Sequence, residues 1–430
     1  MSILNEPLKL PCGAVLPNRL VKAAMTEGLA DARNRATEDH LRLYRRWAAN
    51  GFGLMLTGNV HVDRRHLERP GNIAVDDNDG LDRLRQLAAV GTRDGAHFWM
   101  QINHAGRLTP AVLNPHPLAP SNVSLPMAEA GCGEARAMTE DDILDAIRRF
   151  ARTAETARDC GFTGVQIHAA HGYLLSQFLS PLANTRDDAW GGSLENRARL
   201  LLETVAAVRS AVGRDCPISV KLNSADFQRG GFSFDESLQV AAWLNDAGID
   251  LLEISGGNYE QMQMVGLGES AAHTGRPVAV STAAREAYFL DFAQQLRPKV
   301  HMPLLITGGM RTVATMTDAL TGGACDAIGI GRPICIDPDR AVRRLLAGEI
   351  DALPAVEHEL HLHPDALGPD VDPLTFKRVE SFGLLGWFCL QLLQLGAGKE
   401  PDLTMDVLDA LHRYKANETT AAAAWARPAR

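Results

Sequence analysis

The stretch GVQIHAAHGY at residues 164–173 combines a short apolar run with polar side chains at its end. Apolar and β-branched runs of this length are typical of buried β-strands. The run follows a long amphipathic segment, and this alternation is typical of parallel β/α units. We therefore expect a strand over Gly164–His168 in a parallel sheet, with His171 and Tyr173 just beyond its carboxyl end.

Seven further runs of the same kind occur along the chain. They cover Arg19–Ala23, Gly53–Thr57, His97–Ile102, Ile218–Leu222, Leu251–Ile254, Leu304–Thr307 and Ala327–Ile330. Eight strands are the number that closes a β/α barrel, and single barrels commonly run to about 250 residues or more. The sequence therefore predicts an α/β fold with one (β/α)8 TIM barrel over residues 1–345.

Helix start signals and long loops fit the same arrangement. Thr37 and Thr139 each place a capping hydroxyl before acidic residues, which suit the positive end of a helix. The loops expected after the third, fourth and sixth strands are long, and they cover residues 104–138, 169–194 and 255–281. In a barrel, long loops at the carboxyl ends of the strands build the active site.

The pattern changes in residues 346–430, which we expect to form a C-terminal helical extension packed on the barrel. An acidic linker precedes the apolar segment Phe382–Gly398, which polar residues interrupt and which falls short of the roughly 20 residues of a membrane span. We expect this segment to form a core helix or a contact between subunits of a homo-oligomer. A short helix is expected near Met405–Tyr414, and the alanine-rich Thr419–Arg430 is expected to be frayed or disordered.

Composition narrows the class of protein. The chain of 430 residues is 46% hydrophobic and 22% charged, with a net charge of −9, so it is typical of a globular protein and gives no basic surface for nucleic acid. Its seven cysteines include no Cys-x-x-Cys pair, which argues against disulfides, zinc and iron–sulfur sites. No signal peptide is evident at the N-terminus, and we expect a cytoplasmic protein with no membrane partner.

Polar and glycine residues follow six of the eight predicted strands. They are Met25 and Thr26 after the first strand, Gln101 and His104 at the third, His168, His171 and Tyr173 at the fourth, Lys221 at the fifth, Gly308–Met310 at the seventh, and Gly331 and Arg332 at the eighth. Glycine-rich turns after the last two strands let backbone N–H groups approach a phosphate, and Arg332 adds positive charge. A phosphorylated cofactor is implied.

The fourth strand carries the most distinctive chemistry. His168, His171 and Tyr173 offer two imidazole donors and a phenol, which suit binding a carbonyl oxygen while a proton is delivered nearby. The same histidines could instead bind a metal, although no acidic or cysteine ligand stands beside them, or form a structural pair. We expect no metal.

The stretch HAAHGYLLSQFLSPLANTRDDAWGGSLENR at residues 168–197 resembles the signature of the old yellow enzyme family of FMN-dependent ene-reductases and NAD(P)H:flavin oxidoreductases. Further similarities lie at PNRLV (17–21), QINHAGR (101–107) and IGR (330–332), so the resemblance covers roughly residues 1–345. It implies FMN as the cofactor, with NADH or NADPH as the hydride donor.

The resemblance also implies a role for each matching residue. Ala24, Met25, Gly58 and Gln101 would contact the flavin ring, Thr26 would tune it by a hydrogen bond, Gly309, Gly331 and Arg332 would hold the phosphate, His168 and His171 would bind the substrate oxygen, and Tyr173 would donate a proton. Lys221 stands where the family usually has arginine, and it would stabilise negative charge on the reduced flavin as a point charge.

The resemblance predicts reduction of activated alkenes, such as α,β-unsaturated carbonyl or nitro compounds, by a ping-pong mechanism. Many bacterial members have cysteine at the position of Thr26, so redox tuning by a thiol is not expected here. Two other functions remain open: a flavin-dependent amine or N-methyl oxidoreductase, and a non-catalytic flavin-binding redox sensor. The missing iron–sulfur motif disfavours the amine dehydrogenase form and the multi-cofactor dienoyl-CoA reductase branch.

Overall fold

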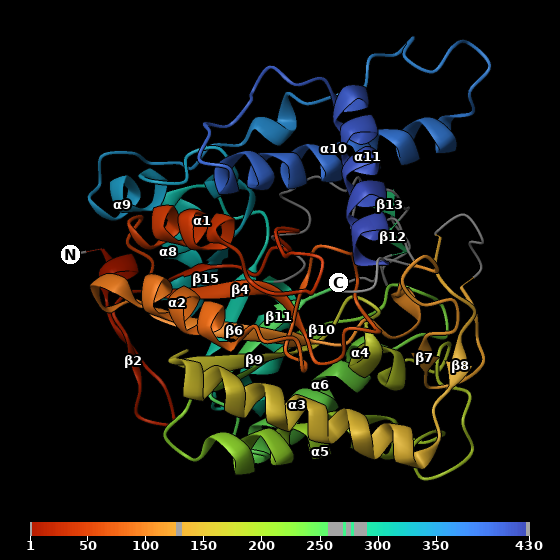
Figure 1. Cartoon of the computed structure of the whole chain (residues 1–430). Helices are drawn as coiled ribbons and strands as arrows, with labels where there is room; N and C mark the ends of the chain where they lie inside the picture. The colour runs from red at the N-terminus through yellow and green to blue at the C-terminus, as the bar shows by residue number, and fades with distance from the viewer. Residues whose placement is uncertain (1, 126–130, 257–269, 272–276, 279–289, 427–430) are drawn as a thin grey trace.

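Eight parallel strands form a closed barrel in the computed structural model, which describes residues 2–125, 131–256, 270–271, 277–278 and 290–426 (Figure 1). The strands are β3 (Leu20–Lys22), β4 (Leu54–His61), β6 (His97–Asn103), β9 (Gly164–Ala169), β10 (Ile218–Asn223), β11 (Leu251–Ser255), β14 (Leu304–Thr307) and β15 (Ala327–Ile330). Each pairs with the next in the chain, and β3 pairs with both β15 and β4, which closes the ring. The predicted TIM barrel is confirmed.

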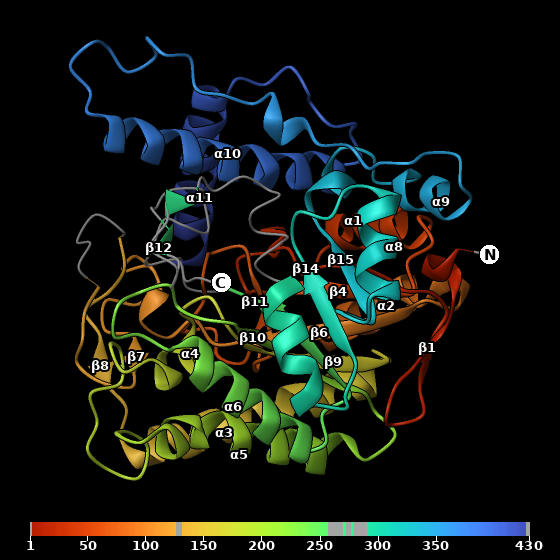
Figure 2. The ribbon, with the colours of Figure 1, turned by 180° about the vertical axis from the view of Figure 1, so that it is seen from behind.

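Helices lie around the outside of the strands (Figures 1 and 2). They are α1 (Glu38–Ala48), α2 (Leu81–Gly91), α3 (Glu140–Cys160), α5 (Leu194–Val212), α6 (Phe234–Asp246), α8 (Val313–Thr321) and α9 (Ala341–Leu346). The expected cap at Thr139 is present, since its side chain accepts a hydrogen bond from the N–H of Asp142 at the start of α3. Gly161 ends the same helix with φ of 97°, a conformation that favours glycine.

Apolar side chains fill the amino-terminal end of the barrel. A short antiparallel hairpin of β1 (Leu8–Lys9) and β2 (Val15–Leu16) packs there. Leu8 and Leu16 share one hydrophobic cluster with Leu54, Leu251 and Ala327, which are the first residues of their strands. The opposite, carboxyl-terminal end is therefore the one available for a binding site.

The loops at that carboxyl-terminal end carry short elements of their own. They are β5 (Ile73–Ala74), β7 (Leu118–Ala119), β8 (Arg136–Ala137), α4 (Leu174–Leu179), β12 (Ser270–Ala271) and β13 (Pro277–Val278). Most of the loop expected at residues 255–281 lies outside the described residues.

The C-terminal extension contains two long helices, α10 (Pro373–Gly396) and α11 (Val407–Trp425), which pack against each other across one side of the barrel (Figure 2). Trp387 of α10 is fully buried and donates a hydrogen bond to the carbonyl of Met405 (3.1 Å). Within the described ranges, α10 alone has the length and hydropathy to cross a membrane, but 61% of its most apolar window is buried inside the fold. It packs as a core helix does.

The expectation of a frayed segment from Thr419 onward is wrong as far as Trp425, and the predicted short helix is longer than expected. α11 continues to Trp425 because its alanine-rich end has a partner on the barrel loops. Trp425 donates a hydrogen bond to Asn34 Oδ1 (3.1 Å) and packs against a small cluster that includes Leu67 and Leu113. Residues 427–430 lie outside the described residues.

Candidate active site

All the residues expected at the site lie in or just after the strands that end at the open face of the barrel. Ala24, Met25 and Thr26 follow β3, Gly58 lies in β4, Gln101 in β6, His168 in β9, Lys221 in β10, Gly309 follows β14, and Gly331 and Arg332 follow β15. His171 and Tyr173 occupy the turn between β9 and α4. The expected phosphate turns and the expected histidines therefore open on the same end of the barrel.

Two histidines and a tyrosine form a compact aromatic group at this end. The ring centroid of His168 lies 4.9 Å from those of both His171 and Tyr173, in edge-on arrangements. His171 has φ of 63°, a left-handed conformation that is uncommon outside glycine and lets the chain turn sharply after β9. All three side chains are buried, and Tyr173 donates a hydrogen bond to Glu68 Oε2 (2.9 Å).

The hydrogen bonds fix how His168 presents its ring. Its Nδ1 accepts a hydrogen bond from the N–H of Ala170 (3.2 Å), so in the neutral ring the proton is on Nε2. His171 Nε2 lies 2.6 Å from Ser255 Oγ, and the backbone N–H of His171 donates to Asn223 Oδ1. These contacts orient both rings.

Burial keeps both histidines neutral. It lowers the pKa of His168 well below its ordinary value, and the neighbouring His171 and Lys221 lower it further. The pKa of His171 is also well below its ordinary value, mainly because of burial and to a smaller extent because of the charge of Lys221. Near neutral pH each ring therefore offers one N–H as a neutral hydrogen-bond donor.

A chain of buried polar side chains crosses the inside of the barrel. Gln101 Nε2 donates to Gln166 Oε1 (2.7 Å), and Gln166 Nε2 donates to Glu253 Oε2 (2.8 Å). Glu253 Oε1 lies 3.0 Å from Lys221 Nζ. The expected cation is therefore present, but a carboxylate that the sequence analysis did not consider is paired with it.

Close backbone packing surrounds Gly58 and Thr26. The N–H of Gly58 donates to Glu27 Oε1 (2.8 Å), and a Cβ on Gly58 would come within 2.1 Å of Glu27 Oε2. Thr26 Oγ1 accepts a hydrogen bond from Asn72 Nδ2 (2.9 Å). A Cβ there would also come within 2.4 Å of the backbone carbonyl oxygen of Met25, which cannot move aside as a side chain can, so residue 58 requires glycine.

The residues expected to bind the phosphate lie against the C-terminal extension. Gly309 has φ of 77°, and the turn it forms with Gly308 follows β14. The Arg332 guanidinium lies 4.0 Å from Glu357 Oε1 and 5.8 Å from the centre of the Phe388 ring. Glu357 also pairs with Arg311, so two arginines share one carboxylate that the extension supplies.

Comparison with known proteins agrees with this geometry. The model of the NADH:flavin oxidoreductase / NADH oxidase family matches residues 4–347. The chain belongs to this family. Family membership makes FMN the cofactor and NADH the electron donor, and the chain is an oxidoreductase.

Two curated relatives and one solved structure illustrate the similarity. The NADH-dependent flavin oxidoreductase iliE of Neonectria sp. (strain DH2) is 37% identical over 357 residues, which cover 78% of this chain and 46% of that protein. The NADH-dependent flavin oxidoreductase nadA of Aspergillus parasiticus is 34% identical over 442 residues, covering 99% and 91% of the two chains. The old yellow enzyme homologue from Zymomonas mobilis shares the fold, with a TM-score of 0.68, 24% identity, and coverage of 86% and 99%.

The residues of this NADH:flavin oxidoreductase fit FMN. In the described part of the chain, the backbone N–H groups of Gly309 and Gly331 form no hydrogen bond, so they are available to phosphate oxygens. A Cβ placed on Gly331 would meet only Met25, at 3.6 Å, which shows open space at this turn. Gly309, Gly331 and Arg332 would hold the phosphate, and Gly58, Gln101 and Lys221 would face the isoalloxazine.

Sequence reasoning missed four acidic residues of this oxidoreductase. They are Glu27, Glu68, Glu253 and Glu357. Glu253 left a signal, because a charged residue inside the apolar run 251–255 is unusual unless it is paired. Glu68 lies in a loop and Glu357 in a single 3-10 turn (Val356–His358), both away from any predicted strand end, so their positions depend on how these segments fold back.

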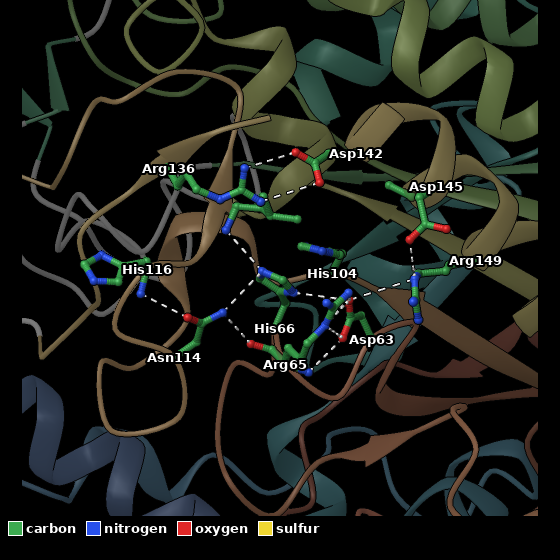
Figure 3. A pocket seen from close by; sticks show the side chains of 12 residues that line it. Asp63, Arg65, His66, His104, Asn114, His116, Arg136, Asp142, Asp145 and Arg149 are labelled. Carbon is green, nitrogen blue, oxygen red and sulfur yellow. Dashed lines mark hydrogen bonds and ion pairs between the residues drawn. The ribbon is translucent and has the colours of Figure 1, made fainter. Parts of the chain in front are cut away.

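A pocket of about 200 Å³ is lined by Asp63, His66 and His104, among other residues (Figure 3). The ligand atoms of these three residues lie within 4.8 Å of one another, as in a metal site. However, His66 Nε2 accepts the N–H of Leu118 (3.1 Å) and His104 Nδ1 accepts the N–H of Gly106 (3.0 Å). The two nitrogens that accept these N–H groups carry no proton, and His66 Nδ1 lies 3.4 Å from Asp63 Oδ2.

This arrangement explains the acidity of Asp63. Burial alone would raise its pKa, but hydrogen bonds from His66 and Arg65 outweigh burial and hold the pKa well below its usual range. A metal would need a ring nitrogen free of its proton, so the hydrogen bonds favour a structural carboxylate–imidazole pair at this place.

Proposed function

We propose that this chain is an ene-reductase, which uses NADH and FMN to reduce activated alkenes such as α,β-unsaturated ketones, aldehydes or nitro compounds. The observation that carries the proposal is the placing of His168, His171 and Tyr173 at the same barrel end as the residues that fit FMN. Two neutral donors beside one phenol suit a substrate that needs its oxygen held while one carbon receives a proton.

Each side chain has a definite task in this proposal. Bound FMN would supply hydride chemistry, taking hydride from NADH and passing it to the β carbon of the alkene. His168 and His171 donate hydrogen bonds to the substrate oxygen, where negative charge develops, and donors of this kind are commonly worth roughly 3–4 kcal/mol. Tyr173 delivers a proton to the α carbon.

The burial of the aromatic group supports these tasks. His168 and Tyr173 are 3% and 2% exposed, so water competes little for their donors. Hydrogen bonds to a developing charge are stronger in such a dry site than in solvent. Lys221, paired with His168 on the adjacent strand, adds positive charge, and Glu253 moderates it.

An anaerobic experiment on the FMN-loaded protein tests the proposal. NADH should bleach the flavin absorbance, and 2-cyclohexenone should then restore it with formation of cyclohexanone. Saturated cyclohexanone, which offers the same oxygen but no alkene, is the matched control and should restore nothing. Failure of NADH to bleach the flavin, or of the enone to restore it, contradicts the proposal.

A further inference from the structure

Glu68 lies directly behind the phenol of Tyr173. Its Oε2 accepts the hydrogen bond from the Tyr173 hydroxyl (2.9 Å), and Asn59 Nδ2 contacts the same oxygen. The backbone N–H of Glu68 donates to His61 Nε2 (3.3 Å), which fixes the loop after β4 at the barrel end. The carboxyl group is therefore positioned on one specific hydroxyl, the one proposed to protonate the substrate.

Charged and titratable groups surround Glu68 from several elements. Arg69 is its chain neighbour and pairs with Glu418 of α11 (Nε to Oε2, 3.1 Å). Tyr414 of α11, Cys389 of α10 and Thr26 after β3 also interact with the Glu68 carboxyl. Burial raises the pKa of Glu68 to about 7, because this effect exceeds the opposing contributions of Tyr173, Arg69 and Thr26. Both protonation states are therefore accessible near neutral pH.

Glu68 also lines a cavity. The cavity has a volume of about 530 Å³ and lies between the loops after β4 and β6 and helix α11. Val112, Tyr414 and Ala422 line it together with Glu68 and Arg69. Most of the cavity wall is apolar, but the cavity is open at the surface and Glu68 is partly exposed, so solvent water reaches its carboxyl group. Glu68 thus connects the buried Tyr173 with a source of protons.

We propose that Glu68 replaces, with a proton of its own, the proton that Tyr173 gives to the substrate, an inference that rests on the proposed function. As the Tyr173 O–H bond breaks and the α-carbon C–H bond forms, the protonated Glu68 carboxyl transfers its proton to the Tyr173 oxygen. Glu68 is left as a carboxylate and is protonated again by water in the cavity. The substrate gains one proton, the phenol is restored, and the proton comes from solvent.

The protonation state of Glu68 also sets the direction of the phenol hydrogen. An ionised Glu68 accepts a hydrogen bond from the Tyr173 hydroxyl, which turns the hydroxyl hydrogen away from the substrate. A protonated Glu68 can donate to the same oxygen and leaves the Tyr173 hydrogen free for the α carbon. Glu68 acts through Tyr173 and is therefore a positioning and proton-supplying residue.

The test compares the wild-type enzyme with Glu68→Gln, which has the same shape but cannot give up a proton. In the wild type, the rate at which an enone reoxidises the flavin should fall as pH rises through about 7. In Glu68→Gln this fall with pH should disappear. The rate of flavin reoxidation by the enone at pH 6 should be about tenfold or more below that of the wild type, and the rate of flavin reduction by NADH should be unchanged. FMN content confirms that the variant is folded.

Glu418→Gln is a matched control on the same cavity. The Glu418 carboxylate raises the pKa of Glu68. Removal of the Glu418 charge should therefore shift the fall in the reoxidation rate to lower pH without abolishing it. A purely structural role for Glu68 would not produce this shift. Glu68→Asp, which keeps a carboxyl group, should retain a pH step that Glu68→Gln lacks.

A second readout does not depend on turnover. Infrared difference spectra should show a carboxyl group that titrates near pH 7 in the wild type and is missing in Glu68→Gln. In Tyr173→Phe its pKa should rise, because the Tyr173 hydrogen bond stabilises the carboxylate. An unchanged pH step in Glu68→Gln, or a carboxyl signal insensitive to Tyr173→Phe, overturns the proposal. A wild type that reduces no enone overturns the proposed function instead, and the proton step with it.

Discussion

Lys221 Nζ lies 3.0 Å from Glu253 Oε1 inside the barrel, on adjacent strands at paired positions. The family's usual arginine is thus replaced by a lysine whose charge is offset by a buried carboxylate. A buried cation next to a flavin favours the reduced, more negative form, and a paired carboxylate weakens that effect. The midpoint potential of bound FMN should therefore depend on both residues.

Glu253→Gln should raise the midpoint potential of bound FMN. The amide can still accept the hydrogen bond from Gln166, but it no longer offsets the charge of Lys221. A change of about 1.4 kcal/mol corresponds to about 30 mV for a two-electron couple, and we expect a rise of at least that size. Lys221→Met should shift the potential in the opposite direction. Equal potentials in the wild type and both variants contradict this account.

Tyr173→Phe should separate the two half-reactions. Loss of the proton donor should slow alkene reduction by about 100-fold or more, in line with the usual contribution of a general acid. Reduction of the flavin by NADH needs no such proton and should change little. Stopped-flow absorbance measures each step separately, and equal losses in both would show that Tyr173 has another role.

In Glu68→Gln, which removes the carboxyl group that titrates near pH 7, the affinity for a saturated ketone should not depend on pH between 6 and 8. An ordinary histidine, with a pKa of about 6.5, would lose its positive charge in this range. Burial lowers the pKa of His168 and His171 well below that value, so both rings stay neutral donors throughout. Titration of oxidised enzyme with a saturated ketone, followed by flavin absorbance, measures the affinity. A marked loss of affinity above pH 6.5 would point to a charged imidazole.

Trp425→Ala should loosen the end of α11. The substitution removes the hydrogen bond to Asn34 Oδ1 and the contact with the small cluster around Leu67, at a cost of about 1–2 kcal/mol. Hydrogen exchange in the last turns of α11 should become faster. Thr420→Ala on the exposed side of the same helix is the control and should leave exchange unchanged. Identical exchange in both variants would mean that Trp425 does not anchor α11.

The barrel and much of its site could be predicted from the sequence, because each buried strand leaves an apolar run and many site residues lie at or near the end of such a run. His168, Lys221 and Gly331 are examples of this local signal. Glu68 and Glu357 could not be predicted, since they reach the site through loops and an extension whose folding depends on distant contacts. The ordered end of α11 was missed for the same reason, because its partner Asn34 is 391 positions away.

Isotope transfer into the product tests the central claim most directly. Reduction of 2-cyclohexenone with NADH that carries deuterium at both C4 positions, in ordinary water, should place deuterium on the β carbon of cyclohexanone. Unlabelled NADH in heavy water should place deuterium on the α carbon, where Tyr173 delivers its proton. Deuterium from NADH on the α carbon, or no saturated product at all, would contradict the account.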